Sequence, residues 1–178
     1  YVDDVCSAYT YTGNGSTQTI NNGIDLAGEG GLVWIKGRSG ATDHALYDTA
    51  RGATLDLVSN STAGQITQST GLTTFGNSGF SVGSLAKLNT NSSTYASWTF
   101  RKAPKFFDVV TYTGNGVEGR QIPHALGVAP GMVIVKITGI ADDWYVWHMG
   151  LSVSTSALRL NATSGAIDGG PSWFPSVP

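Results

Sequence analysis

The residues of this chain whose types and spacing could support chemistry gather in one short acidic and aromatic segment. Asp142 and Asp143 stand directly before Trp144. Paired carboxylates can hold Ca²⁺ or act as acid and base on a glycosidic bond. An indole beside carboxylates can stack on a sugar ring whose hydroxyls bond to the acids. Adjacent carboxylates on a strand point to opposite faces, so solvation in a loop is the simpler interpretation of the pair. We therefore treat Asp142, Asp143 and Trp144 as a candidate glycan contact and not as a catalytic site.

Other patterns that could indicate catalysis, a cofactor or a metal are incomplete. Residues 28–31 read Gly-Glu-Gly-Gly, but the Lys-Ser or Lys-Thr of a phosphate loop does not follow. The histidines His44, His124 and His148 do not have the spacing of metal ligands with a further Cys or carboxylate. No Gly-x-Ser-x-Gly elbow on a strand-turn-helix is expected, because no helix is predicted to carry one. We expect no catalytic, cofactor-binding or metal-binding residues, and we expect that the protein is not an enzyme.

Composition indicates a turn-rich β protein. Of the 178 residues 24 are Gly, and only 12% are charged, against about a quarter in an average domain. The formal net charge of −2 provides no basic footprint for nucleic acid. No apolar run approaches the roughly 20 residues of a membrane span, so we expect neither nucleic acid nor membrane insertion. The single cysteine, Cys6, excludes an intrachain disulfide framework.

An internal repeat organises the sequence. Thr-Tyr-Thr-Gly-Asn-Gly at residues 10–15 recurs at residues 111–116, an offset of 101. Val-Trp-Ile-Lys at residues 33–36 is matched by Val-Ile-Val-Lys at residues 133–136, an offset of 100. A nearly constant shift of this kind predicts a duplication.

The repeat predicts a domain organisation. We expect a first unit over residues 1–100, a linker over residues 101–108 and a second unit over residues 109–178. The second unit looks incomplete, because nothing in it matches residues 79–100, whose end alternates as a closing strand does. We expect a continuation of the polypeptide or another chain to supply that strand, since open sheet edges accept added strands.

Alternation and turn residues predict the strands of each unit. Asn-Gly favours a hairpin that joins strands at residues 10–12 and 17–20 in the first copy, and strands at residues 111–113 and 120–122 in the second. Apolar runs at residues 32–36 and 132–137 predict buried strands, each forming a second hairpin with residues 44–48 or 144–148. Alternation also implies that Trp144 and Trp147 cannot both be interior without a bulge. The expected fold is all-β, with two tandem β-sandwich-like or open-barrel units of antiparallel strands and little or no helix.

Several motifs carry a resemblance to a known family. In the first copy they are residues 11–15, 32–38, 46–53, 79–83 and 94–98, and in the second they are residues 122–127 and 147–148. In this order they resemble a repeat of tail fibres and other virion proteins of tailed bacteriophages, with the second copy more divergent.

The resemblance implies a structural module of a phage tail fibre or related virion appendage. It would serve as scaffold and in host attachment, in the virion and outside cells. Its implied partners are other virion proteins, copies of itself in a homo-oligomer such as a trimer, and a host-surface glycan. Two alternatives stay open: a carbohydrate-binding module of a secreted protein, and a glycan-cleaving enzyme.

Overall fold

The fold is built almost entirely of antiparallel strands. The computed structural model describes residues 2–151 and 156–168. Its helices have four residues each: α1 (Val2–Val5), α2 (Leu26–Glu29) and α3 (Ala86–Asn89). No helix within the described ranges is long and apolar enough to cross a membrane. The predicted all-β class with little helix is confirmed.

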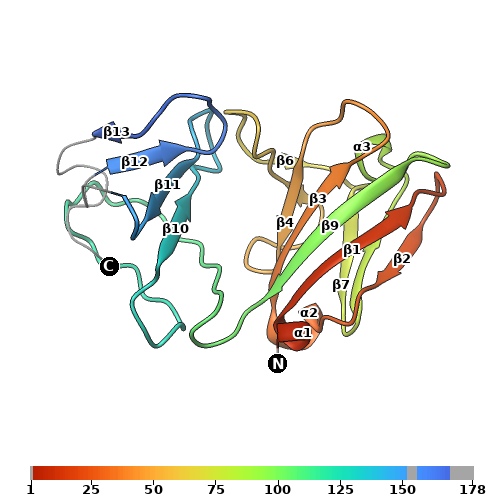
Figure 1. Ribbon diagram of the computed structural model, residues 1–178, viewed down its shortest axis with the longest axis horizontal. Coiled ribbons are helices and arrows are strands. Elements are labelled where there is room, and N and C mark those ends of the chain that lie inside the picture. Colours follow the sequence, from red (N-terminus) through yellow and green to blue (C-terminus); the bar gives the residue numbers. More distant parts are fainter. Residues whose placement is uncertain (1, 152–155, 169–178) are drawn as a thin grey trace.

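The first half of the chain is a two-layered sandwich (Figure 1). One sheet has the order β1-β9-β3-β4 and the other β2-β8-β7, with a small β5-β6 pair beside them. The strands are β1 (Cys6–Thr12), β2 (Gln18–Asn21), β3 (Gly31–Gly37), β4 (Ala45–Asp48), β5 (Leu55–Asp56), β6 (Ile66–Thr67), β7 (Leu72–Gly76), β8 (Gly79–Val82) and β9 (Thr94–Arg101).

Strand alternation fills the space between the two sheets. In β3, Val33 and Ile35 are fully buried in the core, while Leu32 and Trp34 point to the opposite face and are half-buried. The core also takes side chains from both sheets and from the helices: Tyr11, Ile20, Ile24, Leu26, Ala45, Tyr47, Leu72, Phe80, Val82, Leu88 and Tyr95. One face of β3 therefore packs in the core of the sandwich. The apolar side chains of Leu32 and Trp34 on its other face are left to pack against residues outside that core.

The hairpin predicted at residues 13–15 is wrong. β1 pairs with β9 and β2 pairs with β8, so the turn carries the chain from one sheet to the other. The turn binds α3, because Asn89 accepts from the Asn14 amide at 2.9 Å and its carbonyl accepts from the Gly15 amide at 2.8 Å. Gly13 allows this approach, since a Cβ there would lie 2.3 Å from the carbonyl oxygen of Thr90.

The second half contains one further sheet, β10-β11-β12-β13. Its strands are β10 (Met132–Val135), β11 (Tyr145–His148), β12 (Ser156–Arg159) and β13 (Ile167–Asp168). The hairpins predicted from the apolar runs at residues 32–36 and 132–137 are confirmed as β3-β4 and β10-β11.

The strand registers of the two halves coincide. Val33 faces Tyr47 in β3-β4, and Val133 faces Trp147 in β10-β11. Leu55 faces Thr67 in β5-β6, and Ser156 faces Asp168 in β12-β13. The first equivalence is a shift of 100 residues and the second a shift of 101. The same four-strand path is therefore present in both halves.

A segment without strands joins the halves (Figure 1). β9 ends at Arg101, and β10 begins at Met132. The buried carboxylate of Asp108 anchors this segment by an ion pair with Lys102 at 2.9 Å and a hydrogen bond from the Ala125 amide at 2.7 Å. The domain boundaries stay a prediction, and residues 152–155 and 169–178 of the predicted second unit lie outside the described residues.

Candidate functional site

Trp144, which the sequence suggested as a sugar platform, lies between the two halves. Its side chain is only 5% exposed and packs against Leu46 and Leu57, with Leu32 and Trp34 beside them. Its indole Nε1 donates to the carbonyl oxygen of Val58 at 3.0 Å. In this position the indole of Trp144 is covered by protein atoms, so a sugar ring could not stack on it.

Both tryptophans of this segment are buried, although alternation implied that one of them would be exposed. Trp147 is 3% exposed and lies within β11. Trp144 precedes β11, so its direction is not set by strand alternation. It turns toward the first half instead. The sequence rule failed because it assumed that one strand holds both residues.

The carboxylates before Trp144 have partners within the chain. Asp143 forms an ion pair with Arg159 at 2.6 Å and accepts a hydrogen bond from Asn161 at 2.8 Å. Asp142 accepts from the amide of Asp143 at 2.7 Å and from the hydroxyl of Tyr145 at 3.3 Å. These contacts hold the loop in place ahead of β11. A glycan contact of Asp142 and Asp143 stays a prediction.

One asparagine in each half closes this loop in the same way. Asn161 accepts from the amide of Trp144 at 2.8 Å while its amide donates to Asp143. Asn60 accepts from the amide of His44 at 2.9 Å and donates to Asp43 at 2.8 Å. The Asn-x-Thr sequences that contain both residues thus have a local structural use.

Backbone hydrogen bonds extend the contact around Trp144. The amide of Asp142 donates to the carbonyl of Thr62 at 2.8 Å, and the amide of Gln65 donates to the carbonyl of Thr138 at 2.7 Å. Between them, a Cβ on Gly64 would lie 2.9 Å from the carbonyl oxygen of Thr138. We call Trp144, its apolar neighbours and these two loops the inter-sheet contact.

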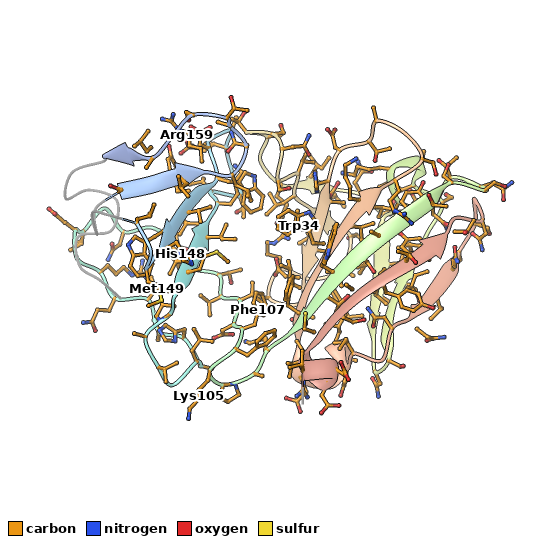
Figure 2. The ribbon with its side chains drawn as sticks, viewed as in Figure 1. Trp34, Lys105, Phe107, His148, Met149 and Arg159 are labelled. Atoms are coloured by element: carbon orange, nitrogen blue, oxygen red, sulfur yellow. The ribbon has the colours of Figure 1, made fainter. Side chains whose placement is uncertain are left out.

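A row of aromatic side chains lies on the same face of the first sheet. Trp34 and Trp98 pack edge to face with ring centroids 6.5 Å apart, and Phe100 stacks on Phe107 at 5.6 Å. Trp98 is 39% exposed. Figure 2 shows Trp34 on the flank of the first half that faces the second sheet. We call these four residues the aromatic row.

The aromatic row continues to His44, whose Nδ1 accepts from the Nε1 of Trp34 at 2.8 Å. Burial lowers the pKa of His44 below its usual value, and the nearby Lys36 adds to this shift. His44 is therefore neutral at physiological pH and serves as a hydrogen-bond acceptor. The pairing of β9 with β3, which no local sequence pattern reveals, is what brings Trp34, Trp98 and Phe100 together.

The most deeply buried charges form ion pairs within the first half. Asp56 is fully buried and contacts Lys87, while Asp48 binds the guanidinium of Arg51 at 2.5 Å. Burial raises the pKa of Asp56, and Lys87 and Arg51 oppose that shift. These groups connect β4, β5 and α3, so their role is structural.

Metal ligands do not cluster among the described residues: no group of three or more His, Cys, Asp or Glu side chains could hold an ion there. An open depression beside α2 includes Glu29, Thr49, Phe75 and Lys102 in its lining. It combines an acid, a base and an aromatic ring in a shallow surface.

The described residues define an antiparallel, sandwich-like β protein whose second sheet is fixed to the first half by side chains and loops. The chain belongs to a family defined by a domain of unknown function, DUF7483, whose model matches residues 3–176. No curated protein and no solved structure matches the chain.

Proposed function

We propose that this chain is a structural module of a phage tail fibre or related virion appendage, without a catalytic role. The observation that carries the proposal is the inter-sheet contact. The indole of Trp144 packs on the first half and bonds to Val58, and the amide of Asp142 bonds to Thr62. Asp143 holds the same loop in place by its ion pair with Arg159 within the second half. A scaffold, unlike an enzyme or a small-molecule carrier, needs no concave ligand pocket at these residues.

The repeated strand path supports the same proposal. Equal registers in the two halves are what a duplicated unit would produce. Duplicated β units that contact their neighbours build elongated, rigid proteins. In this proposal the module lies outside cells in the virion, contacts other virion proteins and copies of itself, and contributes to host attachment.

Purified particles test the proposal directly. Mass spectrometry of phage particles banded on a density gradient should detect the chain in constant ratio to a major tail protein. A map of the particle should then place the sandwich and the second sheet in a fibre or appendage. Recovery of the chain only from the particle-free secreted fraction would contradict the proposal, as would release of reducing ends from a host polysaccharide by the purified protein.

A carbohydrate-binding module is the second candidate, and the aromatic row favours it. Trp98 is exposed beside Trp34, and exposed indoles stack on sugar rings. Trp98→Ala should then abolish binding on a glycan array. Phe106→Ala is the matched control, because Phe106 is similarly exposed at 40% and lies outside the aromatic row. Loss of binding in both variants, or in neither, would count against this candidate.

A further inference from the structure

The outer edge of β10 differs from the same edge in the first half. β3 lies between β4 and β9 and pairs with both. Its counterpart β10 pairs with β11, and no described strand lies on its other side. β9 therefore shows which kind of strand pairs with this edge in the first half.

The hydrogen-bonding direction of each β10 residue follows from the shared register. The Gly31 carbonyl accepts from the Thr49 amide, and the Gly131 carbonyl accepts from the Met149 amide. Because backbone groups alternate in direction along an antiparallel strand, residues 131, 133 and 135 face β11. Met132 and Ile134 therefore direct their amides and carbonyls to the open edge, where no described backbone group bonds to them.

The side chains at this edge are uncovered as well. In the first half, Leu32 and Trp34 are half-buried and stand opposite Phe100 and Trp98 of β9. Their counterparts Met132 and Ile134 are 55% and 40% exposed. Two apolar side chains and the backbone groups beside them thus share one edge on which no described strand lies, which is the combination that strand addition satisfies.

We propose that the outer edge of β10 binds one extended strand of a partner polypeptide, antiparallel to β10. β9 defines the chemistry of that strand. Large apolar side chains should stand opposite Met132 and Ile134, as Phe100 and Trp98 stand opposite Leu32 and Trp34. Small hydroxyl side chains should alternate with them, as Thr99 and Ser97 do in β9. The inference rests on strand geometry and not on the virion role.

A synthetic peptide with the β9 sequence, Thr-Tyr-Ala-Ser-Trp-Thr-Phe-Arg, is the probe. Added to the whole protein, it should slow amide hydrogen exchange at Ile134 at least tenfold and give a saturable calorimetric signal. Even-numbered residues of β9 bond to β3, because the Lys102 amide donates to Gly30 and the Arg38 amide donates to Thr94. N-methylation of the peptide's Trp should therefore abolish binding, while N-methylation of the Thr that follows should leave it unchanged.

Variants of the protein show whether the peptide binds at β10. Ile134→Pro removes an amide that faces the open edge and leaves the β10-β11 bonds intact, so it should weaken binding at least tenfold with an unchanged circular dichroism spectrum. Ile134→Val keeps the amide and should bind as the parent does. Failure of the peptide to bind, equal binding of the two methylated peptides, or binding that Ile134→Pro leaves unchanged would overturn the proposal. Self-association of the protein alone that Ile134→Pro abolishes would also overturn it, by assigning the edge to a second copy.

Discussion

His44 and Trp144 occupy equivalent positions, directly before β4 and β11, and their side chains make different contacts. His44 remains within its own sheet, where it accepts a hydrogen bond from Trp34. Trp144 is larger, and its indole N–H reaches the carbonyl of Val58 in the other half. A change of side chain at one position thus converts a local contact into one between halves.

The stability of the first half should depend on pH through His44. Burial lowers the pKa of His44 in the folded chain from its usual 6.5, so the unfolded chain binds more protons as pH falls below that value. The free energy of unfolding should therefore decrease as pH falls from about 6.5 toward the folded pKa. Protonation of Nδ1 would also remove the acceptor for Trp34.

His44→Asn tests this expectation, because an amide oxygen can accept the same bond without titrating. Urea unfolding at pH 7.5 and pH 5, followed by tryptophan fluorescence, should show a smaller pH effect in His44→Asn than in the parent. His124→Asn, in an exposed segment, is the matched control. An unchanged pH effect in His44→Asn would rule out His44 as the cause.

Replacing only one partner of the Asp56–Lys87 ion pair should lower the free energy of unfolding strongly. Lys87→Met leaves a buried carboxylate without its cation, which costs about 3–5 kcal/mol of unfolding free energy. The double variant Asp56→Leu, Lys87→Met should recover most of that loss, because no charge remains buried. Chemical denaturation of four proteins, the parent, Lys87→Met, Asp56→Leu and the double variant, measures both effects. A double variant whose loss equals the sum of the single losses would contradict this account.

At the scale of elements, the sequence predicted the hairpins that depend on local pattern. β3-β4 and β10-β11 follow from continuous apolar runs beside glycine-containing loops. It failed at residues 10–15 and 111–116, which read the same. The first copy forms the end of β1 because β9 pairs with it, whereas residues 111–113 form no strand. The same local sequence is therefore a strand in the first copy and not in the second, because only the first copy pairs with β9.

The candidate site was predictable only in part, for the same reason. Sequence marked Asp142, Asp143 and Trp144 as unusual, and the structure does give them specific partners. That those partners include Val58 and Leu57 could not be read from the chain, because about ninety residues separate the two segments. The aromatic row depends likewise on the register of β9 with β3.

The second sheet should depend on Trp144 more than the first half does. Trp144→Ala removes a buried indole and should cost about 3 kcal/mol in the inter-sheet contact. Amide hydrogen exchange should then accelerate in β10 to β12, while β3 and β9 keep their protection. Trp98→Ala, which truncates a half-exposed indole, should cause little change. Equal acceleration in both halves would show that the halves do not unfold separately.

At the scale of the whole molecule, the expected homo-oligomer remains a prediction that solution mass can test. Exposed apolar side chains of the joining segment and the second half, including Val117, Ile140 and Met149, favour association. Light scattering of the purified protein should therefore give a multiple of 18.6 kDa, with a trimer expected from the resemblance to fibre proteins. A mass of one chain at all concentrations would contradict the oligomer.

The missing side chain of Gly64 lets the two halves approach each other closely. The φ of Gly64 lies outside the positive range that favours glycine, so alanine there would not be strained on that account, but the added methyl group would meet the carbonyl of Thr138. Gly64→Ala should act as a wedge that opens the molecule while both halves keep their own packing. Small-angle scattering would detect this as a larger radius of gyration with unchanged secondary structure. The closed arrangement would then depend on the absence of a single methyl group.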